Sequence, residues 1–317
     1  MKILVCDDSA VARKSIVRSI GDQPTLSLFE AEDGHQALQI MQCHNIDALF
    51  LDLTMPVMDG FALLEALPVN PYPTDIIVFS ADVQEQAKTR CRQLGAKHFI
   101  SKPFYQAEIE PVFQELGLTF NQQWPKADCQ HSPEQKFKEV ANIALGKGAA
   151  IMANHLDHFI ELPIPHVGYL TYSELAMTMM DVLNQPNSTA VTQRFVGGEI
   201  HGEAFVCLRG KHILDIGNKL GYRPEFTQTA EIYQNIANLL VSSFLLSLGT
   251  MLDKTFSLRQ PAILSSSALQ QIQSKDNEQL FAIEYTCLAE ALDFECEVLF
   301  LVDKPSVEVI LGVMENI

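Results

Sequence analysis

The sequence predicts an α/β protein in two parts. Residues 1–117 are expected to form a doubly wound parallel sheet, and residues 134–317 an α+β domain with an internal pseudo-two-fold repeat. Three observations carry this prediction. Short apolar runs alternate with helix-like stretches in the first part, reactive polar residues follow these runs, and a polar motif occurs twice in the second part, 96 residues apart.

The first part alternates strand and helix patterns. A parallel sheet with helices on both faces is the architecture that such alternation favours. After the first strand, Ser9 is a suitable N-cap for a helical pattern that runs through Ile20. The expected strands are 2–6, 48–51, 76–79 and 97–100, and the further expected helices are 34–43, 60–66, 83–94 and 106–116.

Polar residues stand where these strands end. Asp7 and Asp8 follow the first strand, and Asp52, Ser80 and Lys102 follow later ones. Ligands of open parallel sheets bind at the carboxyl ends of the strands, so these side chains are expected to converge. Three carboxylates suit Mg²⁺, the lysine supplies a positive charge for an anion, and the serine adds a hydrogen bond. One such residue alone reads as a solvated loop residue, whereas this set indicates a carboxylate that accepts a phosphoryl group.

The motifs of this part resemble the receiver domain of two-component response regulators, which has the flavodoxin-like (CheY-like) fold. The resemblance covers residues 1–117, and the motifs that carry it are Asp7-Asp8, Leu51-Asp52-Leu53-Thr54-Met55-Pro56 with Asp59-Gly60, Ser80-Ala81 and Lys102-Pro103.

The resemblance implies a role for each of these positions. Asp52 would be the phosphoacceptor, with a sensor histidine kinase as phosphodonor. The side chains of Asp7, Asp8 and Asp52 and the backbone carbonyl of Thr54 would hold Mg²⁺. The residues implied to bind the phosphoryl group are Ser80 and Lys102, with Phe99 as the switch aromatic.

Residues 118–133 are expected to be a linker. They are polar, contain two prolines and show no periodicity. From residue 134 the organisation repeats, because 205–208 followed by a helix corresponds to 299–302 followed by a helix, at an offset of 94. The expected helices are 134–157, 211–221, 228–252 and 305–315, and the expected strands are 163–165, 189–197, 200–208, 257–264, 279–288 and 295–302.

The repeated motif gives each half of this domain a polar stripe. Twenty-two residues separate Glu139-x-x-Asn142 from Pro165, and the same number separates Asn235-x-x-Asn238 from Pro261. Helix positions i, i+4 and i+7 share one face, so the stripes extend back to Gln135 and Glu231. A single stripe is usually a solvated helix face, but two with the same spacing indicate a duplicated site.

A glutamate and an asparagine on one helix face suit the hydrolysis of an aspartyl phosphate. Catalysis of this reaction consists mainly of positioning and electrostatics. A carboxamide is neutral and offers both a donor and an acceptor to orient water. A carboxylate one turn away can pair with the lysine of a receiver's phosphate site.

Residues 134–317 accordingly resemble the CheC/CheX/FliY family of chemotaxis phosphatases, which dephosphorylate CheY-like receivers. The resemblance implies that Glu139 pairs with the target's lysine and that Asn142 orients the attacking water. In the second copy Asn235 replaces the glutamate, so Asn235 and Asn238 are expected to form a weak or purely structural site.

The expected function is therefore a response regulator that dephosphorylates a CheY-like receiver, either a separate protein or its own. The alternative is a module without catalysis that binds phosphorylated receivers, kinases or flagellar components. The altered second copy favours the alternative, and the intact first copy favours the enzyme.

Composition excludes other classes of function. A net charge of −17 argues against a nucleic-acid partner. Residues 232–252 contain no charged residue, but their several polar residues favour a buried core helix over a membrane span. The seven cysteines show no metal-ligand spacing and no disulfide framework. A cytoplasmic protein without membrane insertion, with a possible homodimer, is expected.

Overall fold

The computed structural model consists of two compact units, residues 1–139 and 140–317, and the boundary falls within one helix, α6 (Pro133–Leu156). Residues 122–131, most of the expected linker, lie outside the described residues, so the linker stays a prediction. The structure describes residues 1–20, 24–67, 74–121, 132–162, 164–172, 174–175, 177, 179–180, 188–210, 213–222, 227–264 and 279–316.

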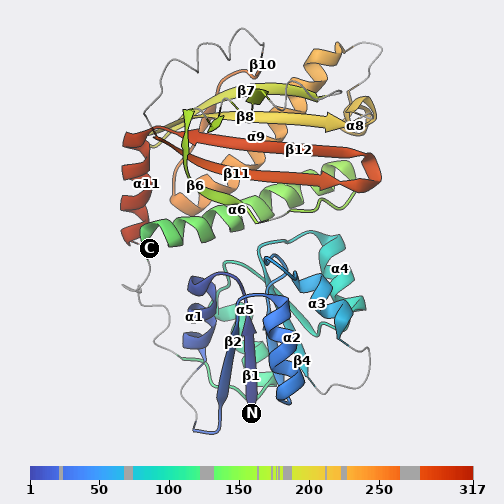
Figure 1. The fold of residues 1–317 in the computed structure, drawn as a ribbon, viewed down its shortest axis with the longest axis vertical. Coiled ribbons are helices and arrows are strands. Elements are labelled where there is room, and N and C mark those ends of the chain that lie inside the picture. The colour runs from blue at the N-terminus through green and yellow to red at the C-terminus, as the bar shows by residue number, and fades with distance from the viewer. Residues whose placement is uncertain are drawn as a thin grey trace. The chain divides into compact units, whose positions relative to one another are not determined.

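The first unit contains a five-stranded parallel sheet with strand order β2-β1-β3-β4-β5, of which Figure 1 labels β1, β2 and β4. This is the flavodoxin-like order 2-1-3-4-5, so the expected fold of this unit is confirmed. The order reverses direction at β1, and the strand ends on either side of this switch point are where a ligand site is expected. The strands are β1 (Lys2–Cys6), β2 (Ser27–Ala31), β3 (Ala48–Leu51), β4 (Asp75–Ser80) and β5 (His98–Ser101).

Within the described residues of this unit, five helices cover the two faces of the sheet. Phe50 and Phe79 point to one face, where Ile16 of α1 and Phe113 of α5 pack against them. Buried residues of the other three helices belong to the opposite face, toward which Leu49 and Leu51 alternate. The helices are α1 (Ala10–Ser19), α2 (Gly34–Cys43), α3 (Gly60–Ala66), α4 (Glu85–Gln93) and α5 (Gln106–Glu115).

The chain continues to pack against the first sheet beyond the expected end of the domain. Leu118 and Phe120 are buried in the same core as Phe113, and Phe120 forms an isolated bridge with Ile20. In the sequence these residues follow Gly117 without helical periodicity, a pattern that predicts a linker. Their burial extends the first unit to at least Asn121, whose backbone N–H donates to Ser19 O at 2.9 Å.

The second unit contains a seven-stranded sheet with strand order β10-β7-β8-β12-β11-β6, in which β9 also pairs with β7 (Figure 1). The strands are β6 (His166–Thr171), β7 (Ser188–Gly197), β8 (Ile200–Gly210), β9 (Ser257–Leu258), β10 (Ala262–Ile263), β11 (Gln279–Ala289) and β12 (Phe294–Val302). The further elements are α8 (Ile213–Lys219), α9 (Thr229–Leu252), the 3₁₀ turn η1 (Glu290–Leu292) and α11 (Lys304–Asn316).

This sheet reads the same when its two halves are exchanged. If β6 is exchanged with β10, β7 with β11 and β8 with β12, the result is the same strand order read from the opposite edge of the sheet. The two long helices, α6 and α9, have 24 residues each and begin 96 positions apart. The internal pseudo-two-fold repeat is therefore present in the strand order and in the helices.

The two long helices pack together on one face of this sheet. Gly148 of α6 lies against the backbone of Phe244 in α9, and the Phe244 ring contacts Phe300 of β12 and Tyr285 of β11. The other face carries Phe205 and a cluster of further apolar residues. Helix α9 alone among the described helices is long and apolar enough to cross a membrane, and 61% of its most apolar window is buried.

The two prolines of the repeated motif explain why two observed strand boundaries differ from the predicted ones. Pro165 directly precedes β6, and Pro261 separates β9 from β10. Proline has no N–H to donate to a sheet ladder, so it stands at strand starts and interruptions. The strand expected at 163–165 therefore begins at His166, and the one expected at 257–264 is two short strands; Pro163 itself lies outside the described residues.

Candidate functional site

The polar residues at the strand ends of the first sheet converge as expected. Asp7 follows β1, Asp52 follows β3, and Lys102 follows β5. One carboxylate oxygen each from Asp7, Asp8 and Asp52 lies within 4.8 Å of the others. The Lys102 ammonium lies 2.7 Å from Asp7 Oδ2 and 3.4 Å from Asp52 Oδ2, and the structure therefore assembles a buried cluster of three carboxylates and one cation.

Burial has the largest effect on the pKa values of these carboxyl groups. It raises the pKa of Asp7 to about 6 and the pKa of Asp52 well above its ordinary value, although the charge of Lys102 opposes both shifts. Burial alone would lower the pKa of Lys102, but the carboxylates of Asp52 and Asp7 outweigh it and raise that pKa well above its usual value. The cluster thus holds more negative charge than one lysine can balance.

The cluster fits a divalent cation. Among the described residues neither carboxylate oxygen of Asp52 accepts a hydrogen bond, although both are buried. Buried polar atoms without partners are costly, and a hard cation bound by carboxylate oxygens satisfies them. Receiver domains generally bind Mg²⁺ at such an acidic pocket, and Asp7, Asp8 and Asp52 are the residues that would hold it. The contribution of the Thr54 carbonyl stays a prediction.

The other predicted site residues of the first unit lie on β4 and β5. Ser80 ends β4 and is buried, and its hydroxyl accepts a hydrogen bond from the Asp82 N–H at 3.1 Å. Its carbonyl accepts from the Lys102 N–H at 2.9 Å, which fixes the two strand ends beside each other. Phe99 is half-buried on β5, where it pairs with Val78. Their roles toward a phosphoryl group stay predictions.

Arg13 is a residue of this site that the sequence analysis missed. Its guanidinium donates to the backbone carbonyls of Asp7 and Asp8 at 2.8 and 3.3 Å, and it pairs with Glu30 and Glu32 at 3.2 and 2.9 Å. It therefore fixes the turn that carries two of the three carboxylates. No local signal identifies it, because an arginine in the first turns of a helix ordinarily reads as surface.

The first polar stripe lies on α6. Glu139 and Asn142 are both half-buried, and they are three residues apart on one face of the helix. Gln135 has a different role: its side-chain oxygen accepts from the Ser132 N–H at 3.1 Å, and the Ser132 hydroxyl accepts from the Gln135 N–H at 3.3 Å. This reciprocal pair caps the start of the helix, so Gln135 is explained without a catalytic role.

The second stripe, on α9, is held by a neighbouring strand. Asn238 Oδ1 accepts a hydrogen bond of 2.7 Å from Nε2 of Gln193 on β7. Asn235 is half-buried one turn earlier, and Gln234 donates to the carbonyl of Pro261 at 3.0 Å. Sequence reasoning did not find Gln193, because a single glutamine in an alternating strand carries no signal.

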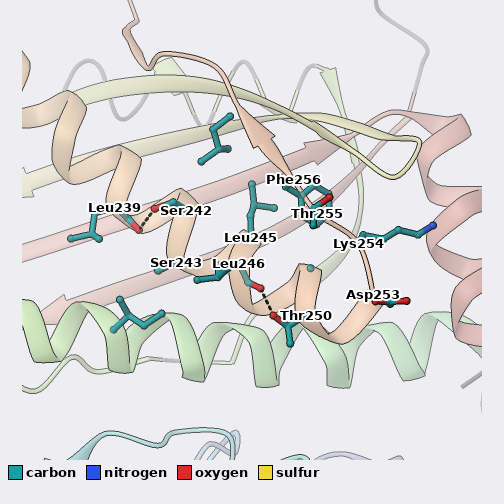
Figure 2. Close-up of a pocket in the computed structure, with 13 residues that line it drawn as sticks. Leu239, Ser242, Ser243, Leu245, Leu246, Thr250, Asp253, Lys254, Thr255 and Phe256 are labelled. Carbon is teal, nitrogen blue, oxygen red and sulfur yellow. Dashed lines mark hydrogen bonds between the residues drawn. The ribbon is translucent and has the colours of Figure 1, made fainter.

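A separate groove of about 630 Å³ lies beside α9 and the chain that follows it (Figure 2). Figure 2 shows Leu245 and Leu246 on the helix side and Thr255 and Phe256 on the other. No residue of either polar stripe lines this groove. It is therefore a different feature from the candidate catalytic positions.

Comparison with known proteins identifies the first unit. Residues 3–114 match the family of the response regulator receiver domain. The chain is 33% identical over 120 residues to chemotaxis protein CheY of Bacillus subtilis, in an alignment that covers 38% of this chain and 98% of that protein.

Longer relatives also match part of this chain. Identity to the response regulator GtcR of Aneurinibacillus migulanus is 34% over 146 residues, which covers 46% of this chain and 56% of GtcR. Identity to a protein-glutamate methylesterase/protein-glutamine glutaminase of Pyrococcus horikoshii is 39% over 106 residues, which covers 32% of this chain and 28% of that enzyme. Receiver domains accept phosphate from histidine kinases, and this chain belongs to the response regulators by the receiver domain at its residues 3–114.

Proposed function

We propose that this response regulator hydrolyses the aspartyl phosphate of a CheY-like receiver with a CheC-like domain at residues 134–317. The observation that carries the proposal is the pair Glu139 and Asn142, which share one face of α6 in a domain of duplicated architecture. A sensor histidine kinase is proposed as phosphodonor to Asp52, and the cytoplasm as the location.

The chemistry requires little beyond positioning. In the hydrolysis, a water oxygen attacks phosphorus, and the bond between phosphorus and the aspartyl oxygen breaks. The products are inorganic phosphate and a free aspartate carboxylate. The Asn142 carboxamide oxygen accepts a hydrogen bond from this water, so that a lone pair of the water oxygen points at phosphorus. Glu139 pairs with the lysine of the target receiver and aligns the two proteins. The acidic residues of the target receiver would hold Mg²⁺, which would supply positive charge near the phosphoryl oxygens.

The two copies of the motif are proposed to be unequal. Asn235 stands where Glu139 stands in the first copy, and a carboxamide forms no ion pair with a lysine. Glu231 lies one turn away, about 6 Å along the helix axis, too far to replace the missing carboxylate. The Glu139/Asn142 pair is therefore the proposed active site.

The test is the rate of phosphate loss from a separate CheY-like receiver after it is phosphorylated with a small-molecule donor. The full chain with Asp52→Asn is added so that its own receiver takes up no phosphate, and the wild-type chain is assayed in parallel. We expect Asn142→Ala and Glu139→Ala each to slow hydrolysis by about a hundredfold, the usual effect of losing one positioned catalytic group.

Asn154→Ala and Glu134→Ala are matched controls, because they make the same changes at exposed positions of the same helix. Asn238→Ala is expected to change the rate less than twofold. Equal rates in all variants would contradict the phosphatase proposal, and binding of the phosphorylated receiver without acceleration would establish the non-catalytic module instead.

The protein's own receiver is a second proposed substrate, since it contains Asp52 and Lys102. Phosphate loss from Asp52, measured at several protein concentrations, distinguishes hydrolysis within one chain from hydrolysis between chains. A rate constant that does not depend on concentration indicates hydrolysis within one chain or within a stable homodimer. One that rises with concentration indicates hydrolysis between chains that associate only transiently.

A further inference from the structure

The two repeats can be aligned residue by residue through their strand pairings. In one half, Leu288 of β11 bridges to Glu161, and in the other, Val196 of β7 pairs with Ser257 of β9. The edge positions 161 and 257 differ by 96, and the strand positions 196 and 288 differ by 92.

The offsets of 92 and 96 also relate a second set of paired residues, one pair from each half of the sheet. Thr192 pairs with Ala262 in one half, and Glu284 pairs with His166 in the other. Gln193 of β7 therefore corresponds to Tyr285 of β11. These are the matching positions beneath the two stripes, because α6 and α9 also differ by 96.

The contacts of Gln193 determine how the Asn238 carboxamide is oriented. Gln193 is only 2% exposed, and its Nε2 donates to the carbonyl of Arg259 at 2.8 Å as well as to Asn238 Oδ1 at 2.7 Å. The Arg259 carbonyl can only accept, so the amide group of Gln193 must face it. The same amide group faces Asn238, and Asn238 must therefore present its oxygen inward and its NH₂ group outward.

This orientation is unsuited to the chemistry proposed for the first stripe. The water that attacks phosphorus donates a hydrogen bond to the carboxamide oxygen. The oxygen of Asn238 is instead turned inward onto Gln193, and its NH₂ group faces the exposed side of the helix. In the first repeat the matching residue is Tyr285, whose ring packs against the rings of both Phe244 and Phe300. Among the described residues no hydrogen bond joins Tyr285 to Asn142.

We infer that Gln193 keeps the second copy of the motif inactive by binding the carboxamide oxygen of Asn238, so that this copy lacks two requirements and not only its glutamate. The inference rests on the proposed phosphatase function. It predicts that Asn235→Glu alone does not create a second active site, whereas Asn235→Glu together with a change of Gln193 does.

The first experiment tests the contact itself and does not depend on catalysis. Thermal unfolding of the full chain is measured for Asn238→Ala, Gln193→Met and the double variant, since methionine keeps the length of glutamine without its donors. We expect Asn238→Ala to lower Tm in the wild-type background and to have little further effect in Gln193→Met. Additive effects would show that the two side chains are not coupled and would overturn the inference.

The second experiment tests whether Gln193 keeps the second copy of the motif inactive. It uses a chain in which Asn142→Ala inactivates the first site. Asn235→Glu and Gln193→Met are added singly and together, and hydrolysis of a separate phosphorylated receiver is measured. We expect the activity of the combined variant alone to rise at least tenfold above the Asn142→Ala background. Equal recovery with Asn235→Glu alone, or no recovery in a combined variant that is folded at the assay temperature, would overturn the role of Gln193.

Two controls distinguish failure of the Gln193 inference from failure of the proposed phosphatase function. A wild-type chain without phosphatase activity would refute the proposed function, and the Tm comparison would still decide whether Gln193 holds Asn238. Gln193→Met in the wild-type chain should leave first-site activity unchanged. If Gln193→Met does not fold, Gln193→Tyr installs the residue of the matching position.

Discussion

Asp82 is a buried carboxyl of the receiver whose titration should affect stability. Burial raises its pKa to about 6, although the backbone N–H of Gln84 donates to its Oδ1 at 3.0 Å and partly offsets the shift. In the unfolded chain its pKa is close to the ordinary 3.8. Between these values the folded protein binds the proton more tightly, so stability decreases as the pH rises from about 4 to about 6.

Asp82→Asn should remove this part of the pH dependence, because the amide cannot ionise and its oxygen can still accept from Gln84. Two pKa units correspond to at most about 3 kcal/mol. Hydrogen exchange of the β4 amides from pH 4 to 7 measures local stability in both proteins. We expect the variant to gain protection relative to wild type as the pH rises, and a constant difference would contradict the assignment.

At the residue scale, the sequence identified the side chains whose chemistry depends on a strand end. Asp7, Asp52 and Lys102 follow apolar runs, and a parallel sheet brings such positions together whatever the details of packing. Arg13 and Gln193 were missed for the opposite reason. Each acts through partners far away in the sequence, and no local pattern encodes which side chains those will be.

Gly60 shows how the start of α3 holds the loop that carries Asp52. Asp59 caps the helix by accepting from the Ala62 N–H at 2.7 Å, and the Gly60 N–H donates to Leu53 O at 2.9 Å. A Cβ atom on Gly60 would lie 2.3 Å from the Asp52 carbonyl oxygen and 2.8 Å from the Leu53 Cα. Backbone atoms cannot yield to such contacts without moving the loop.

Gly60→Ala should therefore displace the phosphoacceptor loop, lower Tm by several degrees and slow phosphorylation of Asp52 at least tenfold. Overpacking of this kind costs about 1–3 kcal/mol. Gly312→Ala is the matched control, because nothing lies within 4 Å of its added Cβ in α11 and alanine favours a helix by up to about 1 kcal/mol. Phosphate-affinity electrophoresis and thermal unfolding measure both effects, and equal behaviour of the two variants would refute the argument.

At the element scale, the predicted strands and helices agree with the structure to within about two residues wherever the apolar pattern is strong. The strand β2 received no residue range, because Ser27–Ala31 is a largely exposed edge strand without an apolar run. The helix α9 was correctly read as a core helix, with buried residues such as Ile236 and Phe244. Apolar patterns in the sequence predict an element when one face of it, or all of it, is buried. An exposed edge strand such as β2 has no such pattern.

For the whole molecule, the repeat was predictable because the motif, the prolines and the helices share one offset. The pairing of the strands was not, since no local signal specifies that β8 and β12 are neighbours at the centre of one sheet. The register places Phe205 opposite Leu299, positions that differ by the offset of 94 seen in the sequence. The axis of the repeat therefore passes beside this pair.

The end of the receiver can be tested by truncation, because three of the four residues beyond the expected boundary contact it. Leu118 and Phe120 are buried, and the Phe120 ring lies 6.0 Å from that of Phe113. The Asn121 side chain donates to Arg18 O at 3.1 Å, in addition to the backbone bond to Ser19. This segment ties the end of α1 to the end of α5.

A fragment of residues 1–121 should fold and accept phosphate, whereas residues 1–117 should be strongly destabilised. Burying two such side chains contributes about 3–6 kcal/mol, and small domains are stable by only about 5–15 kcal/mol. Circular dichroism melting and phosphorylation by a small-molecule donor compare the fragments, with Phe120→Ala in the longer one expected to melt between them. Identical melting temperatures would show that residues 118–121 belong to the linker after all, because a segment that contributes to the core cannot be removed without cost.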